Sequence, residues 1–322
     1  MAELERTEQR NEEVCLLCGG TLHPKISGLF DTRFGIAGTY NLCLCVSCGL
    51  EQLTQRPAPD ELKSLYEQYY NFGGQTGTRY TKLREWFFSS FLYRLWTLLD
   101  GDISFHRVRG SGRLLDVGCN EGRGLEIYRR NGFDVEGLEL NERSANIARR
   151  KGFTVHTDLL EDFRPEAAYE VVVVSNVLEH SLDPRAMLTH ISRVLKPGGH
   201  VWISCPNARS WLRSIFGVCW INWHVPFHIS FFSPTSLRAL LKETGFCRVS
   251  VRQITPALWI SSSIVALVFA RRGRMTTELR SPRLIPGLVL LTRGILFPLL
   301  FLGNRLGRGD CLVLTATRSA LL

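Results

Sequence analysis

Residues 114–125 read LLDVGCNEGRGL, an apolar run that ends at Asp116 and leads into glycines and small polar residues. Such a turn after a buried strand is typical of a ligand that lies close to the backbone. The P-loop pattern requires a lysine that this turn lacks, and the dinucleotide pattern G-x-G-x-x-G would need a glycine where Asn120 stands. The stretch therefore predicts a strand, a turn and a helix around a ligand other than a nucleotide phosphate.

Around this stretch the chain alternates short apolar runs with amphipathic segments, the pattern of an α/β doubly wound parallel sheet. Strands are expected at 113–118, 134–140, 153–160, 169–180 and 200–207, followed by two more at 247–254 and 310–318. In an open sheet of this kind the ligand lies beyond the carboxyl ends of the strands. The residues that end these runs are therefore the candidate functional residues.

The acids at the strand ends indicate S-adenosylmethionine as the ligand. Asp116 is placed to accept hydrogen bonds from the ammonium group of its amino-acid end, and Asn120 suits a left-handed turn. Glu139, at the end of the second strand, suits both ribose hydroxyls, and its charge disfavours a 2′-phosphate. Asp158 and Leu159 offer a carboxylate for the adenine amino group and an apolar side chain for the ring. As an alternative, Asp158 caps a helix.

The chain resembles the class I S-adenosylmethionine-dependent methyltransferases, from LDVGCNEG (115–122) through GLEL (137–140), DLLED (158–162) and VVVSNVLEH (172–180) to VLKPGG (194–199). The Glu-His pair and the segment HVPFHISFFSPTSLRALLKETGF resemble the branch with the ubiquinone-pathway O-methyltransferases. Asn120, where many members have glycine, is the main departure. The resemblance implies a Rossmann-like methyltransferase sheet with Asn176 beside the sulfonium. The expected cofactor-binding residues are Asp116, Gly118, Cys119, Asn120, Gly122, Glu139, Leu140, Asp158, Leu159 and Asn176.

The resemblance also implies an in-line SN2 transfer that depends mainly on positioning. An oxygen or carbon nucleophile still has to lose its proton. His180, just past the fourth strand, is the first candidate for the base, because an imidazole titrates near neutrality. His224 and His228 are second candidates, since WHVPFH leads into the substrate side of the fold. For each of the three the alternative is a structural histidine bonded to backbone.

Two C-x-x-C-G turns, at Cys15–Cys18 and Cys45–Cys48, predict a structural zinc site with four thiolates in an N-terminal zinc ribbon. Cys43 is a possible substitute ligand. Four thiolates leave no open position for catalysis. The first residues show no secretory signal, so the ten cysteines favour a reducing, cytoplasmic location.

The C-terminal part of the chain is basic and apolar. Residues 205–322 carry 15 Lys and Arg but 3 Asp and Glu, so the whole excess of a chain of net charge +9 lies there. Residues 257–270 are too short to span a bilayer. Residues 284–303 are long enough, but Arg293 lies at their centre and Pro286 and Pro298 interrupt them. Because the strand at 310–318 returns to the sheet, we expect surface-lying helices or a re-entrant hairpin at an anionic inner membrane face. The alternatives are a buried helical insert and a dimer interface.

These features divide the chain into five parts. They are a zinc ribbon (1–55), a linker and helical segment (56–110) that is either packed on the core or a lid, a methyltransferase core (111–256), an apolar basic insert (257–308), and the last strand and tail (309–322). The leading hypothesis is methylation of an O or C atom of a small-molecule, saccharide or lipid-linked acceptor near the membrane. An RNA methyltransferase and a non-catalytic binding module are the alternatives. Nucleic-acid amino-methylation is disfavoured, because SNVL stands where an N/D-P-P-Y/F motif would be. The oligomeric state stays open.

Overall fold

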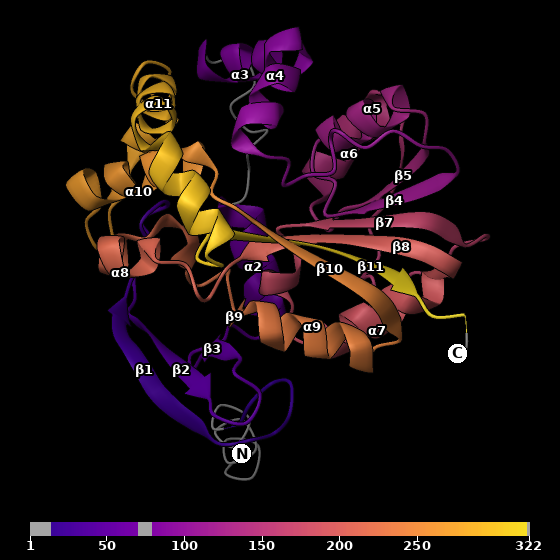
Figure 1. The fold of residues 1–322 in the computed structure, drawn as a ribbon, viewed down its shortest axis with the longest axis horizontal. Coiled ribbons are helices and arrows are strands. Elements are labelled where there is room, and N and C mark those ends of the chain that lie inside the picture. The colour runs from indigo at the N-terminus through magenta and orange to yellow at the C-terminus, as the bar shows by residue number, and fades with distance from the viewer. Residues whose placement is uncertain (1–13, 70–78, 321–322) are drawn as a thin grey trace.

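The main sheet has seven strands in the order β10-β11-β8-β7-β4-β5-β6 in the computed structural model, which describes residues 14–69 and 79–320 (Figure 1). The first residues of the chain, whose lack of a secretory signal supports the predicted cytoplasmic location, lie outside these described residues. The strands are β4 (Arg113–Val117), β5 (Asp134–Leu138), β6 (Thr154–His156), β7 (Tyr169–Ser175), β8 (Leu195–Pro206), β10 (Phe246–Ile254) and β11 (Cys311–Arg318). β6, β5, β4, β7 and β8 run parallel, and β11 pairs antiparallel with β8 and β10. The predicted α/β doubly wound fold is confirmed.

Helices cover the two faces of this sheet, α5 and α6 on one and α7 and α9 on the other (Figure 1). They are α5 (Arg123–Arg130), α6 (Glu142–Arg150), α7 (Pro184–Val194) and α9 (Pro234–Glu243). Successive side chains of a strand point to opposite faces, so Val172 and Val174 join the core under α7 and α9. Val171 and Val173 join the core under α5 and α6. This explains the uninterrupted valine run of β7.

The run LREWFFSSFLYRLWTLL (83–99) predicts one long helix, but the structure has two, α3 (Arg79–Ser89) and α4 (Phe91–Asp100). Ser90 has extended backbone between them, and its hydroxyl donates to the Phe87 carbonyl at 2.7 Å. Serine side chains that bond their own turn compete with the helix in this way. A second boundary also differs: α7 ends at Val194, and KPGG belongs to β8 rather than to a closing turn.

The N-terminal sheet is continuous with the core. β1 (Leu22–Leu29), β2 (Tyr40–Cys45) and β3 (Glu51–Leu53) form it together with β9 (Ser230–Phe231), which directly precedes α9 in the chain. A buried ion pair reinforces this connection, since the Arg213 guanidinium, from α8 (Leu212–Phe216), lies 2.6 Å from the Glu51 carboxylate. Lys25 contacts the same carboxylate at 2.6 Å. The ribbon is therefore anchored to the segment that follows β8.

The insert forms α10 (Ala257–Phe269) and α11 (Leu284–Arg305), which pack against each other beside the sheet (Figure 1). The prolines do not interrupt α11, contrary to expectation. Pro286 lies in its first turn, where no backbone donor is needed, and the helix continues through Pro298. The expected cost of Arg293 is offset inside the protein, because its guanidinium lies 3.5 Å from the buried carboxylate of Asp100 in α4.

We expect Glu51→Gln to lower the free energy of unfolding of the full chain by about 3–5 kcal/mol, because it leaves Arg213 buried without its counter-charge. Urea denaturation measures the loss. Glu142→Gln is the matched control, since its exposed pair with Arg149 is worth about 0–1 kcal/mol. A loss for Glu51→Gln no larger than for the control would contradict the anchoring role.

Candidate functional site

The turn after β4 has the backbone conformation that its sequence predicts. Gly118, Asn120 and Gly122 all have positive φ, of 75°, 50° and 75°. A Cβ at Gly118 would lie 2.7 Å from Val177 Cγ2, so this position has no room for a side chain. The turn is held against β5 by the Gly118 N–H, which donates to the Leu138 carbonyl at 2.7 Å. It therefore presents exposed backbone at the carboxyl ends of β4 and β5.

Asp116 and Glu139 lie at this edge, as predicted from their positions at strand ends. Asp116 is buried under the first turn of α5, and burial, with the nearby Glu139 charge, raises the pKa of Asp116 to about 8. Glu139 accepts hydrogen bonds from the Asn120 and Asn141 N–H groups at 2.9 and 2.8 Å. Burial nevertheless raises the pKa of Glu139. Each carboxylate oxygen keeps a further lone pair, so Glu139 can still accept from two hydroxyls.

The adenine end of the expected site is open to solvent. Leu140 and Leu159, which follow β5 and β6, are both 54% exposed, and Asp158 beside them is exposed as well. Two apolar side chains that stay accessible at adjacent strand ends suit a flat ring. Cys119 differs from its neighbours, because its thiol lies in the core against Leu125 and Gly137. It can offer a ligand its backbone only.

Asn176 follows β7 and has a left-handed φ of 54°. Its N–H donates to the Ser204 carbonyl at 2.8 Å. Its buried side-chain Oδ1 has no hydrogen-bond partner within the described part of the chain. A buried acceptor of this kind costs free energy unless a ligand supplies a donor. The residues present at the three strand ends thus fit S-adenosylmethionine, whose sulfonium methyl is the group that a methyltransferase delivers.

The three candidate bases form one buried cluster. His180 ends the short η2 turn (Leu178–His180), His224 follows the η4 turn (Ile221–Trp223), and His228 lies four residues later. One ring nitrogen of each lies within 4.8 Å of those of the other two. Burial, together with the charge of the Arg33 guanidinium, lowers the pKa of His180 to about 3. The pKa values of His224 and His228 are also lowered by burial, so the three rings are neutral at pH 7.

Two groups of this cluster were not expected from the sequence. Tyr66, from α2 (Pro59–Tyr69), lies with its hydroxyl 2.8 Å from His180 Nδ1. Glu179 is fully buried, and its Oε1 lies 3.9 Å from His228 Nε2. Burial raises the pKa of Glu179 to about 8. The Glu-His pair was visible in the sequence, but only the histidine was assigned a role.

The four predicted thiolates come together in the ribbon. Cys15 Sγ lies 3.4 Å from Cys48 Sγ, and Cys18 Sγ lies 3.4 Å from Cys45 Sγ. Gly19 and Gly49 have positive φ and close the two turns, as the C-x-x-C-G pattern requires. Cys43 lies outside the group. The set is a four-cysteine arrangement that can hold a metal ion.

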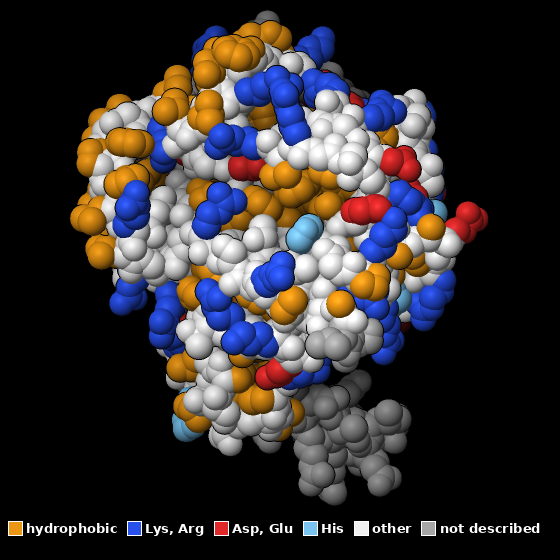
Figure 2. Space-filling view, turned by 45° about the vertical axis from the view of Figure 1, so that its right-hand side comes forward, with side chains coloured by type: hydrophobic (Ala, Val, Ile, Leu, Met, Phe, Trp, Pro, Cys, Tyr) orange, Lys and Arg blue, Asp and Glu red, His pale blue; other side chains and the backbone are white. Residues whose placement is uncertain are grey.

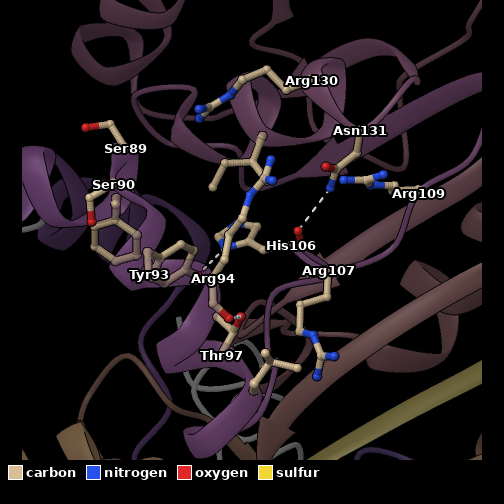
Figure 3. Close-up of a pocket in the computed structure, with 13 residues that line it drawn as sticks. Ser89, Ser90, Tyr93, Arg94, Thr97, His106, Arg107, Arg109, Arg130 and Asn131 are labelled. Carbon is tan, nitrogen blue, oxygen red and sulfur yellow. Dashed lines mark hydrogen bonds between the residues drawn. The ribbon is translucent and has the colours of Figure 1, made fainter.

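A pocket of about 220 Å³ lies between α4, the segment 101–109 and α5 (Figure 3). Four arginines line it, Arg94, Arg107, Arg109 and Arg130, together with Tyr93 and His106. A second cavity, of about 470 Å³, lies between α3 and the start of α5 and reaches Glu121 of the motif turn. None of the predicted cofactor, base or metal residues lines either cavity. They are separate from the candidate site, although α3 lies beside its turn.

The family model for the methyltransferase domain matches residues 80–251, which is more than half of the chain. The chain belongs to this family. Two relatives are ubiquinone biosynthesis O-methyltransferases. The one from Cronobacter sakazakii is 33% identical over 124 residues, 35% of this chain and 51% of that protein. The one from Pectobacterium atrosepticum is 34% identical over 149 residues, 42% of this chain and 61% of that protein. This chain thus spans about half to two thirds of the length of these curated relatives.

The methyltransferase domain is also similar to solved structures. A Thermotoga maritima protein, described as an S-adenosylmethionine-dependent methyltransferase and possible histamine N-methyltransferase, is 18% identical with a TM-score of 0.47, over 74% of this chain and 96% of that chain. An Archaeoglobus fulgidus S-adenosylmethionine-dependent methyltransferase is 18% identical with a TM-score of 0.44, over 71% of this chain and 100% of that chain.

We expect binding of S-adenosylhomocysteine at pH 7 to release about one proton, because the ligand ammonium favours the ionised form of Asp116, whose pKa near 8 keeps it protonated beforehand. Calorimetry in two buffers of different ionisation enthalpy measures the release. Asp116→Asn should bind roughly 10- to 100-fold more weakly and release no proton from this position. Asp134→Asn, at the exposed amino end of β5, is the control and should bind normally. Unchanged proton release in Asp116→Asn would show that the amino-acid end lies elsewhere.

Proposed function

We propose that this protein transfers the methyl group of S-adenosylmethionine to an oxygen atom of a lipid-linked or other membrane-proximal acceptor. The observation that carries the proposal is the meeting of Asp116, Glu139 and Asn176 at one edge of the sheet. Family membership supports the reaction, and the names of the curated relatives support oxygen as the acceptor atom. A carbon acceptor is the other outcome of the test below.

In this proposal the cofactor lies across the carboxyl ends of β4, β5, β6 and β7. Asp116 takes the ammonium group, Glu139 the ribose hydroxyls, and Asp158 the adenine amine, with Leu140 and Leu159 beside the ring. Backbone of 118–122 lies along the ligand. Asn176 is beside the sulfonium, where the unpartnered Oδ1 supports its placement. The acceptor then approaches from the side of His180, the first candidate base.

We propose that the four cysteines hold Zn²⁺ in a structural role. A closed four-thiolate site contributes folding energy and no open position. Cys15, Leu17 and Cys45 belong to the same core cluster as β7 and α7, so the ion would stabilise the wall of the main domain as well as the ribbon.

Membrane contact is proposed for the insert 257–308. Within the described residues, α11 is the helix that is long and apolar enough to cross a bilayer by length and composition. The pairing of Arg293 with Asp100 favours a helix that lies on the protein with its other side outward. Its outward residues include Leu290, Leu291 and Ile295, each more than half exposed. Figure 2 shows one face of the molecule, where hydrophobic side chains gather at the upper and left margins among Lys and Arg.

The arginines around this surface favour an anionic membrane as the partner. Arg271, Arg272 and Arg274 follow α10, and Arg283 precedes α11, all of them exposed. Apolar side chains flanked by cations match the interface of an anionic leaflet, where each Arg adds about 1 kcal/mol. An acceptor held in that leaflet would then have to extend from the membrane surface only as far as the carboxyl ends of the parallel strands.

The reaction is tested by incubating the full chain with methyl-labelled S-adenosylmethionine and fractionated cell extract. We expect label in the lipid fraction, as a methyl ether that is stable to alkali and is released as methyl iodide by hydriodic acid, whereas a C-methyl group would resist both. Glu139→Ala, which loses the ribose contacts, should give at least 100-fold less label. Lys242→Gln, an exposed change on α9 outside the insert, is the control. Label in RNA, or no label with any fraction, would contradict the proposal.

Membrane contact is tested by flotation with vesicles of neutral or anionic lipid. The full chain should bind anionic vesicles, and Leu290→Gln/Leu291→Gln/Ile295→Gln should release it, because the three side chains are already exposed and their burial supplies the affinity. Arg271→Gln/Arg272→Gln/Arg274→Gln should weaken binding more than tenfold. Val46→Gln, on the ribbon, is the control, being 64% exposed. Binding that none of these changes alters would exclude the insert as the contact.

A further inference from the structure

The histidine cluster has the geometry of a metal site. His224 Nδ1 and His228 Nε2 are 3.3 Å apart, and a suitable nitrogen of His180 completes a group within 4.8 Å. Two ligands about 2.05 Å from one zinc ion in a tetrahedral site are separated by about 3.3 Å. The His224–His228 pair therefore already has the required separation, and His180 lies within 4.8 Å of both.

Two of the rings are oriented from outside, as metal-bound histidines usually are. His228 Nδ1 lies 2.8 Å from the Asn222 carbonyl, so this nitrogen is the donor and Nε2 carries the lone pair that faces the cluster. His180 Nδ1 lies 2.8 Å from the Tyr66 hydroxyl, a contact that fixes the orientation of this ring. The Asn222 contact thus selects the tautomer of His228 that metal ligation requires.

The backbone conformation of His224 also supports a metal site. His224 has a left-handed φ of 41°, which a histidine adopts only at some cost. Its carbonyl accepts the N–H groups of Phe227 and His228 at 3.0 and 3.1 Å, and this tight turn returns the chain so that the two imidazoles meet. The strain is thus connected with bringing the rings together.

Glu179 provides a second, independent observation. Its side chain is fully buried, and in the described part of the chain neither carboxylate oxygen has a hydrogen-bond partner. A buried carboxyl without a partner is destabilising. Oε1 is 3.9 Å from His228 Nε2, at the edge of the cluster. A cation among the imidazoles would supply the missing partner, and Glu179 would offset its charge beside Arg33.

We propose that His180, His224 and His228 bind a divalent first-row transition ion, with Glu179 as a fourth ligand or as its neighbouring counter-charge. Three neutral imidazoles are donors that Zn²⁺, Co²⁺ and Fe²⁺ accept readily, whereas Mg²⁺ and Ca²⁺ prefer oxygen. The site is distinct from the four-cysteine site of the ribbon.

The role of this ion rests on the proposed methyl transfer, whereas the presence of the metal site does not. The acceptor hydroxyl would bind the ion through oxygen, which lowers the pKa of that hydroxyl. The proton of that hydroxyl would pass to solvent water. The oxygen then forms a bond to the methyl carbon as the carbon–sulfur bond breaks, and S-adenosylhomocysteine leaves with the electron pair. In that case the histidines would serve as ligands, and this role would replace the role of base proposed above for His180.

The test measures metal content and ligand type in the full chain. The protein is dialysed against buffered Zn²⁺, and zinc per chain is measured by mass spectrometry and zinc-edge X-ray absorption. We expect two ions, with both sulfur and nitrogen scatterers. His228→Asn and His180→Gln should each retain one ion with sulfur ligands only, while His23→Asn, an exposed change on the ribbon, should retain two.

Tyr66→Phe is the finer probe, because it keeps the fold and all ligands but removes a contact that orients His180. Its zinc affinity at the histidine site should fall about 10-fold. One ion per wild-type chain with sulfur scatterers alone would overturn the site, whatever the variants do. Calorimetry with S-adenosylhomocysteine on the same samples keeps the two proposals apart, because the metal count is independent of cofactor binding and turnover.

Discussion

The parallel arrangement of β6, β5, β4, β7 and β8 is the constraint on which the functional site depends. Parallel strands bring all their carboxyl ends to one edge, so residues far apart in the chain meet there. Asp116 lies near the end of β4, and Glu139 and Asn176 directly follow β5 and β7, so the three converge for this reason. The same edge carries the Glu179–His180 turn. The antiparallel β11 extends the sheet without adding a functional residue to that edge.

Buried charges connect the other parts of the molecule to this sheet. Glu51 and Arg213 join the ribbon to the segment after β8, and Asp100 and Arg293 join α4 to α11. Each pair would be costly if either partner were removed, which makes these contacts specific in position. Asp100 is bound twice, since its Oδ1 also accepts the N–H of Ala257 at 3.0 Å. The start of α10, the middle of α11 and the end of α4 therefore have fixed positions relative to one another.

The sequence predicted the turn after β4 and the acids at the strand ends because that information is local. A strand, a tight turn and an acid at the strand end can be read from consecutive residues, and the positive φ of Gly118 and Asn120 follows from the same stretch. The two cysteine turns are local in the same sense. The division of the helix at Ser90 was missed because it depends on where a serine hydroxyl bonds. Nothing in the spacing from His180 to His224 indicated that they meet.

That missing information lies in contacts between distant segments, and it changes how the histidines are understood. Taken one at a time, His180, His224 and His228 were alternatives for a single base. Taken together with Tyr66 and Glu179, they form a buried polar cluster in which a neutral ring is a weak base but a good ligand. Tyr66 comes from α2, some 114 residues before its partner, and Asn222 belongs to the turn between α8 and β9. Only the folded chain brings these groups to the end of β7, beside the place proposed for the sulfonium.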